Sequence, residues 1–382
     1  MAVLFAEGFT GVPRASQTMS VSSLSKLGYV LKSLNGTSAD VTSNSSWAAQ
    51  VTADPVFADR NRVALYSTNN GSSWLSQMRM PLDTQGFEKF VIGFTAETLS
   101  AATAQSVQVA LTGNTPVTTT ALPADTLVTV TVPNDGVSPG GAYDGTTSTP
   151  LPNVAKGKLM HIEALIEQDV DRVRIYVDGV LVCDYTYTGT FAKADGGFSL
   201  IARWPTAQAN GSSGVYFSNV YMLGVDATHP GILGPATRIL EVAPRTDKDV
   251  EWKHPDAYAS NAAVLQQYFD AANPAYLTTG GPATDLYGGL DVVGQNAAAV
   301  HGAAAVHGAV FKMQAMTMAE GTHTLASAVQ YNTTKAIGTK EYPLTLATLN
   351  NFVMDVSKNP ATNAKWTPQD IASAGFGFRL IK

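Results

Sequence analysis

The chain has very little cysteine and little charge. Cys183 is the single cysteine in 382 residues, which excludes an intrachain disulfide and a cysteine-rich metal site. Without a neighbouring His or run of cations, we expect it to be an unreactive strand residue. Charged residues make up 14% of the chain, the formal net charge is -6, and no basic run occurs. This composition argues against a nucleic-acid partner, which requires clustered Lys and Arg.

Long apolar runs are also missing. The stretch Met1–Phe9 has no basic region and only a short apolar run, so it predicts neither a signal peptide nor a membrane anchor. We expect it to form a first strand and expect no membrane insertion.

The clearest local signal is a β-hairpin within Val173–Cys183. Two runs rich in β-branched residues meet at Asp178 and Gly179, and Asp-Gly is a preferred pair for a two-residue turn with positive φ at both positions. The turn predicts that Val177 lies opposite Val180, that Ile175 lies opposite Val182, and that Val173 lies opposite Asp184.

The preceding run, Lys158–Glu167, alternates apolar and polar residues. One side is aliphatic, and the other carries His161, Glu163 and Glu167. This period of two predicts a strand with one face in the core and the three polar residues on a solvated face.

Short strand-like runs separated by turn residues recur along the first 225 residues. The pattern predicts an all-β sandwich. Residues 226–236, rich in Pro and Gly, predict a linker between a domain of residues 1–225 and a smaller β-rich domain of residues 237–382, with one short helix over Asn261–Phe269. A further helix start is predicted at Pro368, after Thr367.

Two resemblances to known families follow from these patterns. The strand and hairpin "IYVDGVLV", with the late strand Val215–Met222, resemble the concanavalin A-like jelly roll of lectins and laminin G modules. The stretches "ILEVAPRTDKDVEW", "ATDLY", "THTL" and "NPATNAKWTPQDIASAGFGFRLI" resemble the C-terminal module of tailed-bacteriophage structural proteins, in which it commonly follows a jelly roll that begins much as "LFAEGF" does. The resemblance implies an all-β virion component with a jelly-roll sandwich followed by a smaller β-sandwich-like domain.

The jelly-roll resemblance also raises an enzymatic alternative. Laminarinase-type glucanases of this fold use the spacing E-x-D-x-x-E, but Glu163 and Glu167 have no acidic residue between them. A G-x-S-x-G match at Gly136–Gly140 lies in a Pro- and Gly-rich stretch that predicts a loop without the flanking strand and helix of a nucleophile elbow, and the chain has no phosphate-binding G-x-x-x-x-G-K loop. No catalytic residue is therefore assigned.

A short repeat places His301 and His307 six residues apart between small residues. On one strand their side chains would lie about 20 Å apart, too far to share a metal. We predict no metal and no cofactor, and we interpret 297–309 as a packing segment that suits contact with a neighbouring subunit.

Sugar binding commonly uses exposed aromatic residues, and the candidates are Trp47, Trp74, Tyr143, Trp204 and Trp252. Because most aromatic residues lie in strand-like runs, core packing is the preferred interpretation. The ligand-binding residues are left unassigned.

Together these observations predict a non-enzymatic structural component of a tailed-phage particle, in the tail, baseplate, collar or capsid surface. It would be made in the bacterial cytoplasm and located in the virion. Expected partners are other virion proteins and further copies of the chain, with a trimer favoured because closed cyclic symmetry is usual. The alternatives are a receptor-binding protein that recognises a host-surface glycan through the jelly-roll rim, and a glycan hydrolase.

Overall fold

A computed structural model of the chain forms two compact units, Leu4–Ile239 and Leu240–Lys382, the latter grouped with Met1–Val3. The structure describes residues 3–7, 9, 24–25, 28–35, 47–53, 61–67, 73–81, 87–100, 106–133, 140–144, 147–186, 197–204, 213–226, 231–239, 242–243, 245–266, 276–288, 291–292 and 305–382.

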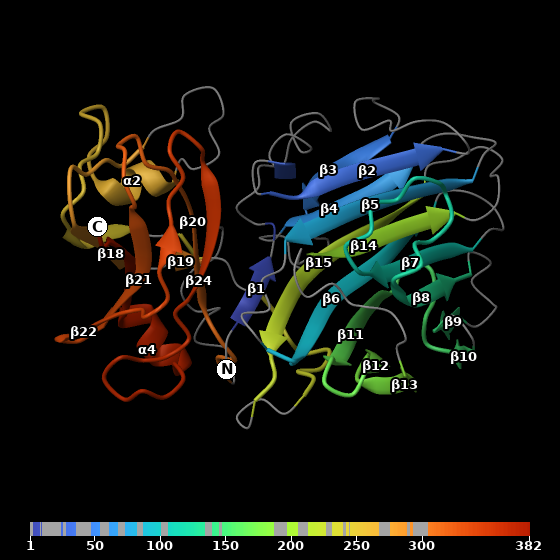
Figure 1. Cartoon of the computed structure of the whole chain (residues 1–382). Coiled ribbons are helices and arrows are strands. Elements are labelled where there is room, and N and C mark those ends of the chain that lie inside the picture. The colour runs from blue at the N-terminus through green and yellow to red at the C-terminus, as the bar shows by residue number, and fades with distance from the viewer. Residues whose placement is uncertain are drawn as a thin grey trace. The chain divides into compact units, whose positions relative to one another are not determined.

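The first unit is a jelly-roll sandwich of two antiparallel sheets, so the predicted all-β class and jelly-roll fold are confirmed (Figure 1). In the described residues one sheet has eight strands and the other has seven. The larger sheet contains β1 (Val3–Glu7), β3 (Trp47–Ala53), β4 (Asn61–Ser67), β6 (Lys89–Ser100), β11 (Leu159–Glu167), β12 (Arg172–Val177), β13 (Val180–Thr186) and β15 (Ser213–Gly224). The smaller sheet contains β2 (Val30–Asn35), β5 (Trp74–Pro81), β7 (Val107–Thr112), β8 (Thr126–Val132), β9 (Gly140–Tyr143), β10 (Ser148–Leu151) and β14 (Gly197–Trp204).

The predicted hairpin is present as β12 and β13. Its turn residues Asp178 and Gly179 have φ values of 51° and 81°, and Val177 lies opposite Val180. The register then shifts by one residue, so Ile175 lies opposite Cys183 rather than Val182. This β-bulge is why the predicted pairing is correct at the turn and wrong farther out.

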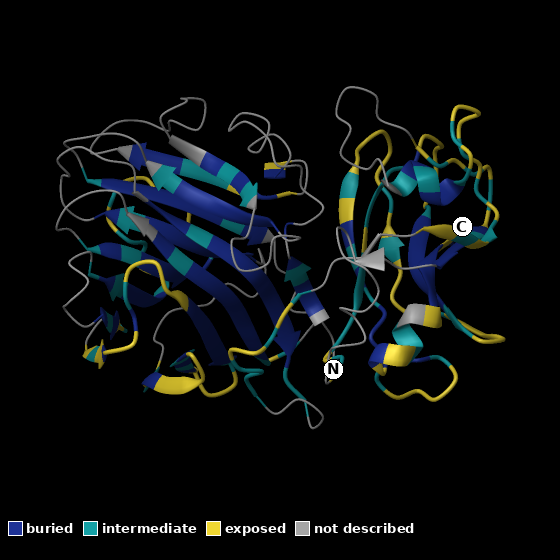
Figure 2. Ribbon diagram, turned by 180° about the vertical axis from the view of Figure 1, so that it is seen from behind, coloured by how far each residue is buried: buried dark blue, intermediate teal, exposed yellow. Residues whose placement is uncertain are grey.

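Both sheets bury aliphatic and aromatic residues between them, and Figure 2 shows the central strands of this unit in the buried colour. The rings of Phe5 in β1 and Phe198 in β14 make an edge contact across the two sheets at 5.9 Å. Met160, Ile162, Ala164 and Ile166 of β11 are buried as their alternation predicts, and the core therefore lies where the period of two places it.

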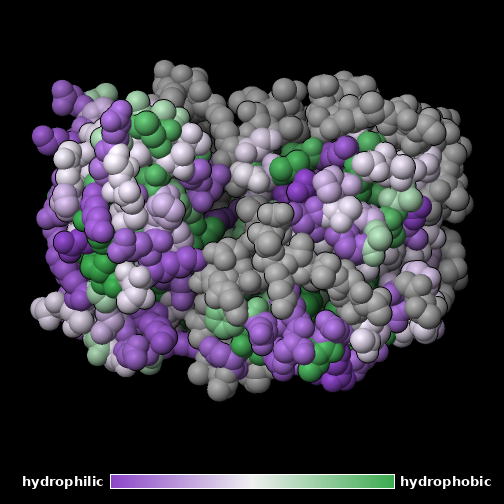
Figure 3. Space-filling view, viewed as in Figure 1, coloured by the Kyte–Doolittle hydropathy of each residue, from purple (hydrophilic) through white to green (hydrophobic). Residues whose placement is uncertain are grey.

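The second unit is built from smaller antiparallel sheets and two short helices. Figure 3 shows hydrophilic and hydrophobic residues interspersed on the viewed face of this unit. Its elements are β16 (Val242–Ala243), β17 (Thr246–Val250), α2 (Asn261–Gln266), β18 (Ala283–Gly288), β19 (Asp291–Val292), β20 (Val310–Ala315), β21 (Thr324–Tyr331), β22 (Thr334–Ile337), β23 (Tyr342–Pro343), β24 (Asn350–Asp355), α4 (Pro368–Ser373) and β25 (Gly375–Leu380).

Both helix starts predicted in the second unit are confirmed. Helix α2 begins at Asn261, and α4 begins at Pro368 with Thr367 as its N-cap. The Thr367 side chain accepts a hydrogen bond from the backbone N–H of Asp370, as an N-cap residue does. Among the described residues, no helix combines the length and the apolar character needed to cross a bilayer.

Candidate functional site

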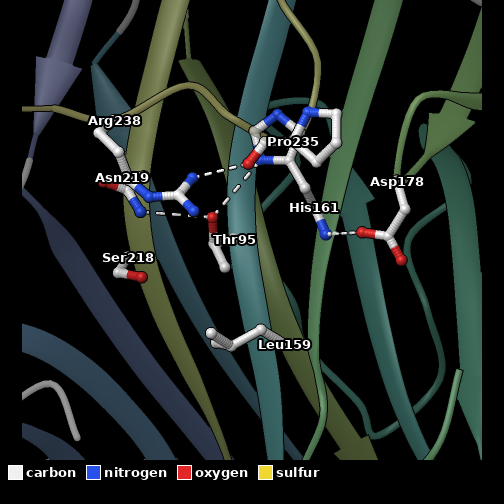
Figure 4. A pocket seen from close by; sticks show the side chains of 8 residues that line it. All are labelled: Thr95, Leu159, His161, Asp178, Ser218, Asn219, Pro235 and Arg238. Carbon is white, nitrogen blue, oxygen red and sulfur yellow. Dashed lines mark hydrogen bonds between the residues drawn. The ribbon is translucent and has the colours of Figure 1, made fainter. Parts of the chain in front are cut away.

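A small polar pocket opens on the larger sheet, on the face of β11 that carries His161 (Figure 4). Its volume is about 210 Å³. Its lining combines a guanidinium, a carboxylate, an imidazole, an amide and two hydroxyl groups with two apolar residues. The residues are Thr95, Leu159, His161, Asp178, Ser218, Asn219, Pro235 and Arg238.

The sheet itself brings the floor of the pocket together. Thr95 on β6 lies opposite His161 on β11 and opposite Ser218 on β15, so three neighbouring strands contribute side chains at one level. The pairing of β15 with β6 shifts after Ser218, and Asn219 adopts a positive φ of 50°. This irregularity places two consecutive polar residues of β15 at the pocket, where a regular strand would turn every second residue away.

The hairpin turn forms one wall. The Asp178 carboxylate accepts a hydrogen bond from the backbone N–H of His161 at 2.8 Å, and the Asp178 N–H donates to the His161 carbonyl at 2.8 Å. Asp178 is exposed and the His161 side chain is buried. The turn that organises the hairpin thus also holds a carboxylate beside the pocket.

Residues 231–239, which we call the cover segment, form the other wall and contribute Pro235 and Arg238. Gly234 in this segment has a φ of 86°, a conformation that favours glycine. The cover segment approaches the hairpin tip, where a Cβ added to Gly179 would meet Pro235 Cδ at 3.4 Å. Residues 231–236 were predicted to be part of a linker, and here they belong to the jelly-roll unit and cover a face of its sheet.

The cover segment buries Glu163, which corrects the prediction of a solvated strand face. The exposed fraction of Glu163 is 0% and that of His161 is 3%. Glu163 accepts hydrogen bonds from the backbone N–H groups of Leu233 (2.7 Å) and Gly234 (2.9 Å), and from the Tyr221 hydroxyl (2.7 Å). Because three donors replace water around the carboxylate, its burial is tolerated. Glu167, on the same strand face, is only partly buried and forms ion pairs with a lysine and an arginine.

A line of polar contacts joins Glu163 to the floor of the pocket. His161 Nε2 lies 3.1 Å from the Tyr221 hydroxyl, and His161 Nδ1 lies 3.4 Å from the Thr95 hydroxyl. The side-chain amide of Asn219 donates to Thr95 Oγ1 at 3.4 Å. Five side chains from three strands thus form one connected network. Within it, the two ring nitrogens of His161 contact two different hydroxyl groups.

Burial sets the ionisation of this network. Burial, and then the positive charge of Arg238, lower the pKa of His161 from 6.5 to about 4, so its ring is neutral at neutral pH. His161 Nε2 lies 3.7 Å from Glu163 Oε2, which is beyond hydrogen-bond distance, and a neutral ring forms no ion pair. Burial, followed by the neighbouring carboxylate of Glu163, raises the pKa of Tyr221, which therefore keeps its proton.

The pocket gives no support for hydrolysis by a carboxylate pair. Such enzymes need two carboxyl groups on either side of the scissile bond. Asp178 is exposed at the pocket, whereas Glu163 is fully buried and bound by three donors. Within the described ranges, no group of three or more His, Cys, Asp and Glu residues is arranged to hold a metal ion.

The other residues singled out in the sequence are not among the described residues that line this pocket. Trp74 and Trp204 are buried against each other with ring centroids 4.6 Å apart, as core packing predicts. Tyr143 is exposed, Trp252 is partly buried, and the side chain of Trp47 lies outside the described residues. His307 is exposed, while His301 lies outside the described residues.

Cys183 lies in β13, as the strand prediction has it, and its side chain is buried. Burial, and then the charge of Asp144, raise the pKa of its thiol to about 11. Because the thiolate is the nucleophile, this residue is unreactive at neutral pH.

Among the polar pocket residues, Thr95, Ser218, Asn219 and Arg238 were not anticipated from the sequence, and neither was the role of Asp178 as a wall. A weak signal existed for Asn219, because Asn in the middle of the apolar run Val215–Met222 is unusual in a regular strand. Thr95 and Arg238 are ordinary in their local sequence, and only the fold brings them beside His161.

No protein-family model matches the chain, and no curated protein matches it. Solved structures do match. The alginate lyase Aly36B, in complex with an alginate trisaccharide, has a TM-score of 0.36 and 10% identity, with 59% of this chain and 99% of that chain covered. A carbohydrate esterase from Shiga toxin-encoding bacteriophage phi24B has a TM-score of 0.35 and 15% identity, with coverages of 52% and 91%. A sialidase has a TM-score of 0.35 and 11% identity and covers 59% of this chain, which spans only 19% of the sialidase.

These matches correct the prediction of a non-enzymatic structural component, because the matched proteins are enzymes that act on carbohydrates. At such identities the likeness concerns the jelly-roll fold alone.

Proposed function

We propose that the jelly-roll unit is a glycan-processing domain that binds an anionic sugar in the pocket between the hairpin turn and the cover segment. The observation that carries this proposal is the convergence of Arg238, Asp178, Asn219 and His161 on one small pocket. Few but well-placed polar groups beside an apolar wall are typical of sites for small polar ligands.

Arg238 supports an anionic ligand. Its side chain is exposed at the pocket, and its Nη1 donates to the carbonyls of Pro235 and Thr237 at 2.7 Å each, which holds the guanidinium in place. A planar, permanently charged guanidinium matches a carboxylate, sulfate or phosphate. Asp178 on the opposite wall can accept hydrogen bonds from sugar hydroxyl groups.

His161 and Thr95 supply proton-transfer chemistry. The imidazole is neutral, so it can accept a proton, and the Thr95 hydroxyl lies 3.4 Å from Nδ1. A hydroxyl beside an imidazole can pass a proton from a substrate to the ring. This pair, beside a cation that holds the substrate's negative group, suits abstraction of a proton from an acidic sugar. It also suits attack of the Thr95 hydroxyl on an ester carried by the sugar: the hydroxyl proton passes to His161 Nδ1, the acyl group is transferred to Thr95, and the sugar hydroxyl leaves with the proton from the ring.

The binding step is tested with Arg238→Gln against a panel of polyuronates, sulfated glycans and acetylated glycans, with neutral glycans for comparison. Loss of a charge-assisted contact should weaken binding of the anionic glycan by about tenfold or more. Arg172→Gln is the matched control, because Arg172 is an exposed arginine at the other end of β12 that pairs with Asp184. Equal affinity for neutral and anionic glycans, or equal loss in both variants, would contradict the proposal.

The chemical step is tested on the same panel by measuring unsaturated uronate, new reducing ends and released acetate, which separate elimination, hydrolysis and de-esterification. His161→Gln and Thr95→Val should each abolish turnover and leave binding within a few-fold of the unmodified protein. If no glycan of the panel is bound or converted, the proposed function is wrong.

The proposal includes a location on the surface of a phage particle, where a glycan-processing domain would meet the host envelope. Its support is the resemblance of the C-terminal stretches to phage structural modules. Mass spectrometry of purified particles tests the location. The predicted trimer and the predicted contacts with other virion proteins stay predictions, which sedimentation and cross-linking of the particles test.

A further inference from the structure

The polar network beneath the pocket begins and ends on the cover segment. At one end, the backbone N–H of Ile239 donates to Asn219 Oδ1 at 3.1 Å. At the other end, the N–H groups of Leu233 and Gly234 donate to Glu163. The side chains between these two ends belong to the sheet, so the network ties both ends of the cover segment to one face of the jelly roll.

The direction of each hydrogen bond in the network follows from its ends. Glu163 can only accept, so the Tyr221 hydroxyl donates its proton to it. With that proton committed, the Tyr221 oxygen can only accept from His161, and therefore the ring proton of neutral His161 is on Nε2. Nδ1 then carries the lone pair, and this lone pair faces the Thr95 hydroxyl.

We infer that Glu163 is the positioning residue of the pocket: it anchors the cover segment that carries Arg238, and through Tyr221 it sets the tautomer of His161. The carboxylate touches no substrate, because it is fully buried. It determines instead which nitrogen of His161 can receive a proton and where the guanidinium stands. The positional part of this inference concerns the protein alone, and its consequence for catalysis rests on the function proposed above.

Two spectroscopic measurements on the protein without glycan test the positional part. The ring ¹⁵N chemical shifts of His161 should show the Nε2–H tautomer in the unmodified protein at neutral pH. In Glu163→Gln the amide cannot accept from all three donors, since its nitrogen is a donor. Exchange of the Leu233 or Gly234 amide hydrogen should then become faster by about tenfold or more.

Glu167→Gln is the matched control, because Glu167 shares the strand face with Glu163 but pairs with Lys89 and Arg174 instead of the cover segment. This variant should leave the exchange of both amides and the tautomer of His161 unchanged. If Glu163→Gln does not fold, Glu163→Asp serves the same purpose, because a carboxylate shorter by one methylene cannot reach all three donors. An Nδ1–H tautomer in the unmodified protein, or unchanged exchange in a folded Glu163 variant, would overturn the inference.

The catalytic consequence is read from steady-state kinetics with whichever glycan is converted. Glu163→Gln should raise KM, because Arg238 is no longer held, and should lower kcat, because His161 loses its fixed tautomer. The spectroscopic results do not depend on any glycan, so failure of the proposed function leaves them interpretable. Conversely, a glycan converted equally well by Glu163→Gln would reject the positioning role without affecting the proposed function.

Discussion

The two units of the chain each contain a fully buried carboxylate held by the same kinds of donor. Glu163 in the jelly roll accepts from two backbone N–H groups and the Tyr221 hydroxyl. Asp285 in the second unit accepts from two backbone N–H groups, those of Glu251 (2.7 Å) and Trp252 (2.8 Å), and from the Tyr287 hydroxyl (2.6 Å). Both side chains are 0% exposed.

The surroundings of the two carboxylates differ. Asp285 also accepts from the side-chain amide of Asn261 at 2.8 Å, and its tyrosine partner packs in the apolar core of the second unit with Phe378. The tyrosine partner of Glu163 leads instead to His161 and an open pocket. Burial of a carboxylate is therefore not a sign of chemistry in itself, and the neighbour of the tyrosine decides whether the network can act on a ligand.

The largest effect is expected from removing the carboxylate that has only a structural role. Asp285→Ala removes the shared acceptor of four donors, and it should lower the free energy of unfolding of the second unit by about 3–5 kcal/mol. Urea unfolding followed by hydrogen exchange in β18 and β25 measures it. Asp249→Ala is the control, because the side chain of Asp249 is 44% exposed and pairs with Lys335, so its loss should change stability little. If Asp285→Ala changed ligand binding by the jelly roll as strongly as it changes the stability of the second unit, Asp285 would not have a purely structural role, and the contrast with Glu163 would fail.

The second effect is a dependence of stability on pH. It distinguishes the network of Glu163, which contains His161, from the network of Asp285. The folded-state pKa of His161 is lowered to about 4 from an ordinary value of 6.5, so the unfolded chain binds more protons between these two pH values. Its contribution to stability is complete above pH 6.5 and is lost as the pH falls toward about 4. The loss for the jelly roll should reach about 3 kcal/mol at most.

Thermal unfolding as a function of pH measures this contribution, and His161→Gln should flatten the curve between pH 6.5 and 4. An equally steep curve in that variant would assign the pH dependence to other groups and remove the electrostatic distinction between the two networks.

The smallest effect comes from the two tyrosines. Tyr221→Phe and Tyr287→Phe each remove one donor from a carboxylate that keeps the others, so each should lower the free energy of unfolding by about 1 kcal/mol. Only Tyr221→Phe should change the ¹⁵N signature of His161 and the kinetics of the pocket. If Tyr221→Phe and Tyr287→Phe had the same kinetics, the hydroxyl of Tyr221 would have only a structural role, as that of Tyr287 does.

Much of the scaffold around the pocket could be predicted from local patterns. The Asp178-Gly179 turn, the alternation along β11 and the start of α4 all depend on residues that are close in sequence, and all are confirmed. The prediction also placed His161 and Glu163 on one strand face. It was wrong about what covers that face, because alternation distinguishes two faces and does not tell which of them meets water.

The sequence by itself therefore determined the jelly-roll strands, the hairpin turn and the residues that share a face with His161, because each follows from side-chain periodicity or backbone preference. Only the tertiary structure decided that this face becomes a pocket. Leu233 and Gly234 donate to a residue 70 and 71 positions earlier, from a segment with no strand or helix period of its own. The partners of a buried polar group are chosen by the path of the whole chain, since hydrogen bonds of this kind depend on position in space and leave no local pattern in the sequence.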